Sequence, residues 1–381
     1  MKKYFNYIKS MVFIAFFLFF IFIGSILLFP KDNTKKCGMQ DVVSNGFLGE
    51  KENSLDVLYI GDSESYASFS PMQMYDEHGF TGYVLGASAQ RIYNQYYYLK
   101  EALKNQSPKV VVIETNTLFR KYSVLKAVLG ELNNSIPFFK YHNRWKKFSF
   151  NDLKLKKDYT HTEVAKGFRI RKMVESADNS DYMKNLGEVV EVPYLNEYYV
   201  GKIKELCQEK GIEVILVSTE SLANMSYARH IGLQKMADRL ELPYLDLNLV
   251  DEIEIDWQVD TADKGDHLNA SGAYKVSKYM GKYLNKIFTE KELDYLKTHQ
   301  SKDTKAGMYA AKEALLKSLK CGLEGYSFLE IEVLHNQSGS PYPYFNFYGK
   351  LKKEIEQNNY KFDLSISHDG NYAIATVIRY R

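Results

Sequence analysis

Ser63 and His267 are the two residues of this chain whose types and surroundings point most directly to chemistry. Ser63 follows a short apolar run and a Gly-Asp pair, so its hydroxyl lies where the chain must turn sharply. A serine becomes a good nucleophile only when a histidine takes its proton and a carboxylate orients that histidine. His267 has Asp263 and Asp266 close by to serve as that carboxylate. The alternative is that Ser63 only caps the helix that follows it.

A parallel sheet would bring these residues together. Short apolar runs, rich in β-branched side chains, predict strands near residues 56–60, 83–85, 110–113, 212–217 and 244–247. Helices are expected over residues 194–210, 221–240 and 270–284. This alternation predicts an α/β fold in which four or five mostly parallel strands are flanked by helices. Ligands of such sheets bind beyond the carboxyl ends of the strands, where Ser63, Gly86 and Asn116 lie.

Ser63, Gly86, Asn116 and His267, in this order, resemble the four blocks of the SGNH (GDSL-like) hydrolase family over about residues 55–285. The resemblance implies a flavodoxin-like sheet and a serine esterase or acyltransferase that acts without a cofactor. By resemblance, Ser63 is the nucleophile and His267 its base. The backbone N–H groups of Ser63 and Gly86, with the Asn116 side chain, would hold the oxyanion. Turn or cap roles are the alternatives for Gly86 and Asn116.

The acid of the triad is less sharply defined by the sequence. The family usually places its carboxylate three residues before the histidine, and Lys264 stands there. Asp263 is four residues before His267, and Asp266 is adjacent to it. Because neighbouring side chains rarely point at one another, we expect Asp263 to be the acid, with Asp266 as the alternative.

The N-terminal 30 residues predict a membrane anchor. Residues 11–29 form an uncharged apolar stretch about long enough to cross a bilayer, and three lysines precede it. We expect it to remain uncleaved and to be followed by a linker over residues 31–54. Lysines on the two sides are balanced, so the charge rule does not orient the span. The short N-terminal tail favours a cytoplasmic N-terminus with the domains outside.

Within the hydrolase-like domain, residues 118–192 read as an insertion rich in lysine, tyrosine and phenylalanine. We expect it to cover the active site and to offer aromatic and basic groups to a sugar or an anionic polymer. The alternative is a solvated helical cover with an apolar underside. The net charge of +3 over 381 residues gives no global bias toward nucleic acid.

Residues 286–381 resemble the holo-acyl-carrier-protein synthase type of 4'-phosphopantetheinyl transferase. The resemblance rests on five blocks in family order: residues 287–293, 310–319, 331–333, 339–341 and 364–377. It implies a small α+β domain that uses Mg²⁺ to move phosphopantetheine from CoA to an acyl carrier protein. By resemblance Glu313 is a metal ligand, and the expected CoA and phosphate contacts are Lys312, Lys317, Gly339, Pro341 and His368. The alternatives are an exposed Glu313–Lys317 helix pair and a turn role for His368.

This second domain departs from its family at the start. The family opens with a Gly-Ile-Asp strand whose aspartate is the other metal ligand, and no such strand precedes Phe288. We therefore expect a truncated domain of low activity. The sequence predicts a membrane-anchored esterase or O-acyltransferase acting on a cell-surface or secreted polymer. Phosphopantetheine transfer by the second domain and a catalytically silent surface scaffold are the two alternatives.

Overall fold

The computed structural model describes residues 2–153, 156–285, 302–319, 326, 328–335, 342–369 and 372–381. The chain divides into two compact units, Met1–Met280 and Gly281–Arg381, whose boundary falls inside a helix that begins at Ala270. Each unit is described by itself. Gly339 and Pro341, two of the residues expected to contact CoA, lie outside the described residues.

A five-stranded parallel sheet is the centre of the first unit. Its strand order is β2-β1-β3-β4-β5, the order of flavodoxin-like sheets. The strands are β1 (Val57–Ile60), β2 (Gly82–Val84), β3 (Val110–Glu114), β4 (Glu213–Ser218) and β5 (Tyr244–Asp246). Every residue of β1, β2 and β3 is buried, which is why these strands read as continuous apolar runs. The expected α/β fold is confirmed.

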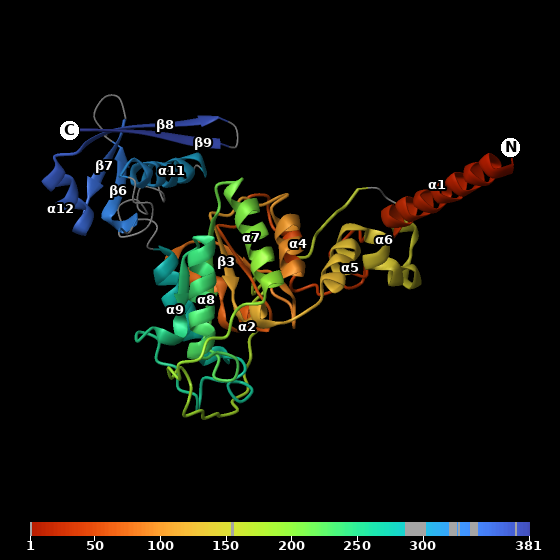
Figure 1. The fold of residues 1–381 in the computed structure, drawn as a ribbon, viewed down its shortest axis with the longest axis horizontal. Helices are drawn as coiled ribbons and strands as arrows, with labels where there is room; N and C mark the ends of the chain where they lie inside the picture. The colour runs from red at the N-terminus through yellow and green to blue at the C-terminus, as the bar shows by residue number, and fades with distance from the viewer. Residues whose placement is uncertain are drawn as a thin grey trace. The chain divides into compact units, whose positions relative to one another are not determined.

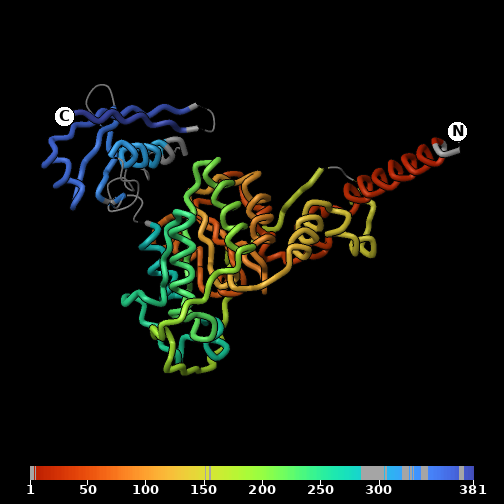
Figure 2. Tube along the Cα trace, viewed as in Figure 1, coloured from red at the N-terminus to blue at the C-terminus, as the bar shows by residue number. Residues whose placement is uncertain are grey.

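Helices flank this sheet, as Figure 1 shows, and Figure 2 follows the same path along the chain. Those of the sheet domain are α2 (Ser63–Ser68), α3 (Pro71–His78), α4 (Ile92–Ala102), α7 (Tyr194–Gln208), α8 (Tyr227–Leu240) and α9 (Ala270–Asn285). Short 3-10 turns are η1 (Gly46–Gly49), η2 (Asn116–Phe119) and η5 (Leu247–Leu249). Apolar side chains of α4 and α7, such as Leu99 and Ile203, pack into one core with the strands.

The first half of the expected insertion packs against the N-terminal helix. This helix is α1 (Lys2–Leu28), and the insertion contributes α5 (Val124–Ser135), α6 (Pro137–Tyr141), η3 (His142–Lys147) and η4 (Phe150–Leu153). The backbone N–H of Phe138 donates to the Ser25 hydroxyl at 3.1 Å. Figure 1 shows α5 and α6 at the end of α1.

The second half of the insertion runs past the loop that carries His267. The backbone N–H of Glu175 donates to Thr261 at 3.1 Å, and that of Lys264 donates back to Glu175 at 3.2 Å. The expected cover over the site is therefore divided. Among the described residues of the insertion, those hydrogen-bonded to the histidine loop lie between Arg171 and Glu175. By contrast, α5, α6 and η3 form a platform in which α6 and η3 contact α1 and α5 contacts α4 of the sheet domain.

The second unit is a small α+β fold. Its elements are α11 (Lys302–Leu319), η6 (Phe328–Glu330), β6 (Ile331–His335), β7 (Pro343–Phe347), α12 (Gly349–Asn358), β8 (Lys361–Asp369) and β9 (Tyr372–Tyr380). The strands pair antiparallel, β6 with β7 and β8 with β9. Its core joins Leu315 and Leu316 of α11 to Ile331 and Leu351.

Candidate active site

The turn after β1 presents Ser63 as the first residue of α2. The Asp62 side chain is the cap, because its carboxylate accepts a hydrogen bond from the backbone N–H of Glu64 at 3.2 Å. Asp62 is fully buried, and its charge is paired with Arg120, whose Nη2 lies 2.7 Å from Oδ2. The capping role considered for Ser63 therefore belongs to its neighbour. The Ser63 hydroxyl therefore does not cap the helix.

Close backbone packing explains the glycine at position 86. A Cβ there would lie 2.2 Å from Ser65 Oγ and 2.9 Å from the Asp62 carbonyl oxygen. Ser65 itself is buried and donates to the Asp62 carbonyl at 2.8 Å. Ser65 is thus a structural serine, and Gly86 lets the strand end approach the turn that carries Ser63.

His267 is held by Asp263. The ring Nδ1 lies 2.8 Å from Asp263 Oδ2, and the backbone N–H of His267 donates to the other carboxylate oxygen at 2.8 Å. Within the described chain, Nε2 is buried without a hydrogen-bond partner. Because the carboxylate fixes the proton on Nδ1, Nε2 is left as the proton acceptor.

Arg171, which the sequence did not single out, supports this pair. Its Nη1 donates to Asp263 Oδ2 at 2.7 Å. Partial burial alone would raise the pKa of Asp263, but the hydrogen bonds from His267 and the charge of Arg171 outweigh burial and hold that pKa below its ordinary value. Asp263 is therefore ionised beside the imidazole.

Asp266, the alternative acid, makes the weaker contact with His267. Its Oδ2 lies 3.3 Å from the same Nδ1 atom, against 2.8 Å for Asp263. Its Oδ1 instead accepts a hydrogen bond from the amide of Asn224. Geometry thus favours Asp263 as the partner of His267.

Glu64 brings the start of α2 beside the histidine. Glu64, Asp266 and His267 each place one possible metal-ligand atom within 4.8 Å of the others. In the described residues no hydrogen bond reaches His267 Nε2, so the Ser63–His267 contact stays a prediction. Catalytic hydrogen bonds are often long in free enzymes and tighten with substrate. The three side chains have the donor types of a cation site, although one of them is the expected catalytic base.

Asn116 points toward the same turn. Its backbone N–H donates to Glu114 at 2.8 Å, and its side-chain amide lies 3.4 Å from Asp62 Oδ2. One amide hydrogen therefore faces the loop of Ser63, and the second is available to a ligand. Asn116 starts η2 directly after β3, the strand end at which an oxyanion donor was expected.

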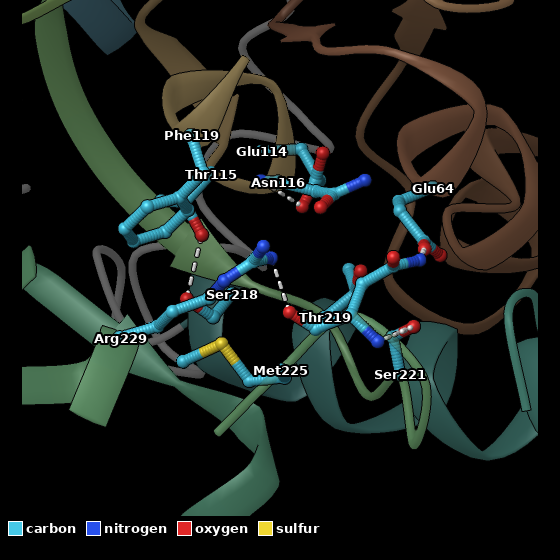
Figure 3. Close-up of a pocket in the computed structure, with 11 residues that line it drawn as sticks. Glu64, Glu114, Thr115, Asn116, Phe119, Ser218, Thr219, Ser221, Met225 and Arg229 are labelled. Atoms are coloured by element: carbon cyan, nitrogen blue, oxygen red, sulfur yellow. Dashed lines mark hydrogen bonds between the residues drawn. The ribbon is translucent and has the colours of Figure 1, made fainter. Parts of the chain in front are cut away.

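A polar pocket opens beside these residues (Figure 3). It is lined by Glu64 from α2, Glu114 from β3, Asn116, Ser218 from β4 and Arg229 from α8, among others. Burial is the main cause that raises the pKa of Glu64 and of Glu114 well above the ordinary value. The charges of Glu114 and Asp62 add to this effect at Glu64, and the charge of Asp62 adds to it at Glu114.

Glu64 and Glu114 were not recognised from the sequence as residues of the site. Their positions, directly after Ser63 and at the last residue of β3, place them near the site. Nothing in their local sequence shows that both are almost fully buried, because that burial comes from neighbouring elements.

The second unit places its expected site residues differently. Glu313 is partly exposed and forms an i, i+4 ion pair with Lys317, the alternative considered for these two. Lys312 is fully buried, and its ammonium donates to the Phe328 carbonyl at 3.0 Å. In this arrangement the Lys312 ammonium is bound to the chain itself, and its expected phosphate contact stays a prediction. His368 packs on α11, where its ring would lie 2.8 Å from a Cβ on Gly307.

The fit of Mg²⁺ to this second unit is poor. Among the described residues, the groups of three potential ligands do not include Glu313. Mg²⁺ dehydrates reluctantly, and sites of this kind use one or two carboxylates together with substrate phosphates. Among the described residues Glu313 is the one expected ligand, and its carboxylate is paired with Lys317.

Comparison with known proteins decides the family of this second segment. The model of the 4'-phosphopantetheinyl transferase superfamily matches residues 271–377. A holo-acyl-carrier-protein synthase from Clostridium botulinum is 40% identical over 97 residues, which cover 25% of this chain and 77% of that protein. The C-terminal part of the chain belongs to this superfamily. A second synthase, from Fusobacterium nucleatum, is 35% identical over 99 residues, covering 25% of this chain and 80% of its own length.

The superfamily match begins inside α9, a helix that runs from Ala270 to Asn285. The described chain therefore enters the transferase segment through a helix. Residues 286–301, where the first matching block was expected, lie outside the described residues.

Solved structures resemble both parts of the chain. A putative acylhydrolase from Bacteroides fragilis has a TM-score of 0.34 and 14% identity, covering 65% of this chain and 96% of that one. A GDSL-like lipase from Bacteroides thetaiotaomicron has a TM-score of 0.32 and 14% identity, covering 64% and 98%. A holo-acyl-carrier-protein synthase from Neisseria meningitidis has a TM-score of 0.24 and 28% identity, covering 27% and 84%.

Proposed function

We propose that the first unit is a serine esterase or O-acyltransferase in which Ser63 is the nucleophile and His267 the base. One observation carries this proposal. Asp263 fixes the Nδ1 side of the His267 ring at 2.8 Å and leaves a buried, unpartnered Nε2, in a loop that also contacts the helix begun by Ser63. An imidazole prepared in this way is what a serine nucleophile requires.

The first half of the proposed reaction breaks the substrate ester and forms an acyl ester on Ser63. Ser63 Oγ attacks the ester carbonyl while its proton moves to His267 Nε2, and the resulting oxyanion accepts hydrogen bonds from the Asn116 amide and the Ser63 and Gly86 N–H groups. His267 then gives the proton to the departing alcohol, which leaves an acyl group on Ser63. Asp263 stabilises the imidazolium throughout and keeps its own charge.

Hydrolysis and transfer differ only in the second half. His267 takes a proton from water or from an acceptor hydroxyl while that oxygen attacks the acyl carbonyl. The bond between the acyl group and Ser63 Oγ then breaks, and His267 returns the proton to Ser63 Oγ. We propose a polymer or sugar hydroxyl at the cell surface as the substrate group. The polar side chains near the expected oxyanion donor, among them Glu64, Glu114 and Asn116, support this choice, because hydroxyl-rich ligands need several donors and acceptors.

Turnover of an activated acyl ester by single variants tests the triad. Ser63→Ala and His267→Ala should each lower kcat/KM by about 10³-fold or more, since triad members act as a unit. Unchanged circular dichroism and thermal unfolding would show that both variants fold. If either variant kept more than about a tenth of the wild-type rate, the assignment would be wrong.

We propose that α1 anchors the chain in a membrane with the two units outside. Residues Asn6–Leu28 form a helix long and apolar enough to cross a bilayer, and a signal sequence has the same character. A reporter fused after Arg381 reads the side directly, and a cytoplasmic reporter would contradict the proposal.

A second candidate function is the transfer of phosphopantetheine from CoA to an acyl carrier protein by the second unit. Identity of 40% to a holo-acyl-carrier-protein synthase favours it. The geometry opposes efficient activity, because Glu313 is paired with Lys317 and Lys312 is buried. An outside location would also separate this unit from cytoplasmic CoA.

We therefore expect the full chain to convert little apo acyl carrier protein when it is incubated with CoA and Mg²⁺. Mass spectrometry of the carrier detects the added phosphopantetheine directly. Stoichiometric conversion that disappears in Glu313→Ala would show that the second unit is a working transferase, and Lys361→Ala, on β8, serves as a surface control.

A further inference from the structure

Helix α5 exposes an apolar face that no described part of the chain covers. Five aliphatic side chains on this helix are between 45% and 67% exposed: Val124, Leu125, Val128, Leu129 and Leu132. Their spacing places them on one arc of about 140° around the helix axis. A soluble surface rarely gathers so many aliphatic side chains on one helix face, and such a patch usually marks an interaction site.

The opposite face of α5 is fixed to the sheet domain, so the exposed face cannot turn inward. Ala127 is buried, and a Cβ on Gly130 would lie 2.3 Å from the Tyr93 ring. Glu131 accepts a hydrogen bond from the Tyr199 hydroxyl of α7 at 2.7 Å. The five aliphatic residues therefore point away from the domain as a consequence of its packing.

The segment that follows α5 is attached to the last turn of α1. The Phe138 ring fills the space beside Gly24, where an added Cβ would lie 2.5 Å from it. Arg144 donates through Nη1 to the Leu28 carbonyl at 2.7 Å, and the rings of Phe29 and Tyr141 meet edge to face at 5.4 Å. Because the apolar span ends at Leu28, α6 and η3 lie where α1 would leave the hydrocarbon.

The surface around this junction has the composition of a bilayer interface. Trp145 is 66% exposed and Phe150 is 92% exposed. Lys146 and Lys147 are exposed beside them. Tryptophan and lysine are enriched at the level of lipid headgroups, where an aromatic ring and a charged tip are both accommodated.

We propose that residues 124–153 form a second membrane-contacting element, with α5 lying in the bilayer interface beside the anchor. The inference rests on α1 being a membrane span, and it does not depend on the chemistry of Ser63. Continuity with α1 identifies lipid as the occupant of the apolar face. A helix of 12 residues with one aliphatic face and basic neighbours is the type that lies along a membrane surface.

This contact would hold the first unit in a fixed position above the membrane. An anchor of one helix permits rotation and tilt, whereas a second contact removes much of that freedom. The mouth of the Ser63 site would then lie at a constant height, which suits a substrate attached to the same surface. The first half of the insertion thus has a role in placing the domain.

Quenching of tryptophan fluorescence by brominated lipid tests the proposal on the full chain. The protein is reconstituted into vesicles of phosphatidylcholine and phosphatidylglycerol, with or without bromine on the acyl chains. Trp257→Phe leaves Trp145 as the reporter, and Trp145→Phe leaves Trp257, which packs on Tyr182. We expect bromine to reduce Trp145 emission about twofold or more and to leave Trp257 unchanged.

A matched pair on α5 tests the apolar face itself. In the background lacking both native tryptophans, Val128→Trp places a reporter on the aliphatic arc, and Lys126→Trp places one about 160° away on the same helix. Only Val128→Trp should be quenched. Equal emission from both reporters with and without bromine, in protein that floats with the vesicles, would overturn the proposal.

Other occupants give different results. A second copy or a membrane protein partner covering the face would shift Val128→Trp emission to the blue without bromine quenching, and this also overturns a lipid contact. If the chain fails to float with the vesicles, α1 does not anchor it in a membrane, and the proposal is overturned. Turnover of an acyl ester is measured separately, so failure here is distinguished from failure of the proposed activity.

Discussion

Asp263 and Asp266 compete for the same nitrogen of His267, and their distances predict an unequal outcome. Asp263 makes two 2.8 Å contacts with His267, whereas Asp266 lies 3.3 Å away and is engaged with Asn224. Asp263→Asn should therefore lower kcat by about 10²- to 10⁴-fold, through loss of the correct tautomer. Asp266→Asn should cost less than about tenfold. The reverse ranking in ester turnover would assign the acid to Asp266.

Glu220 is a buried carboxyl group outside the His267 loop, and its ionisation should change the stability of the fold with pH. Neither of its carboxylate oxygens has a hydrogen-bond partner among the described residues other than its own backbone N–H, and burial raises its pKa from 4.5 to about 8. Between these values the unfolded chain releases the proton and the folded chain keeps it. Glu220 therefore lowers stability progressively as pH rises from 4.5 toward 8.

Glu220→Gln removes this titration, so the variant should be more stable than the wild type by about 1–3 kcal/mol at pH 7. Thermal unfolding measured between pH 4 and pH 8 should show the difference shrinking to nearly nothing at the acid end. A difference that is constant across this range would mean that Glu220 is already ionised in the folded protein.

At the scale of single residues, the sequence allowed predictions for residues whose neighbours in the sequence suggest a role. Ser63 and Asn116 follow strands, and His267 has Asp263 one turn earlier. Arg171 could not be found in this way, because its contact with Asp263 spans 92 residues of sequence. The burial of Lys312 could not be predicted either, because its sequence neighbours do not show that it faces the core.

Gly86 allows the chain after β2 to pack closely against the turn that carries Ser63. The approach of the β2 strand end to the Ser63 turn leaves no room for a Cβ. Gly86→Ala should therefore destabilise the fold by about 1–3 kcal/mol and lower ester turnover. Gly201, inside α7 with open space around it, is the control, and Gly201→Ala should stabilise by about 0.5–1 kcal/mol. Equal effects on thermal unfolding would contradict the packing argument.

The strands were predictable because buried parallel strands are continuous apolar runs, and their observed bounds lie close to those expected. Helix α8 was not: its predicted start at Ser221 is replaced by a start at Tyr227, capped by Ser226. Ser221 instead donates to the Asp266 carbonyl at 2.9 Å. A tertiary contact with the histidine loop thus outweighs the local preference for helix.

The platform of α5, α6 and η3 is the largest departure at this scale. Its aromatic and basic composition suggested a cover for substrate, and the same composition suits a bilayer interface. Sequence alone does not separate these, because both require exposed aromatic rings beside lysines. Contacts with Ser25 and Leu28 of α1 support the proposed contact with the bilayer.

At the scale of the whole molecule, the chain joins an α/β unit with a hydrolase-like histidine site to a segment of the phosphopantetheinyl transferase superfamily. Two activities in one chain impose opposite demands on location, since CoA is cytoplasmic and the proposed polymer substrate is not. The side of the membrane on which the two units lie therefore decides which of the two proposed activities can reach its substrate.

Covalent labelling measures directly whether Ser63 is a nucleophile activated by His267. The full chain is treated with a fluorophosphonate, which phosphonylates a serine whose proton is taken by a base, and the adduct is located by peptide mass spectrometry. Ser63 should carry the label in the wild type, and His267→Ala should lose it while Asp266→Ala keeps it. Labelling of another serine, or labelling of Ser63 that survives His267→Ala, would contradict a His267-activated nucleophile.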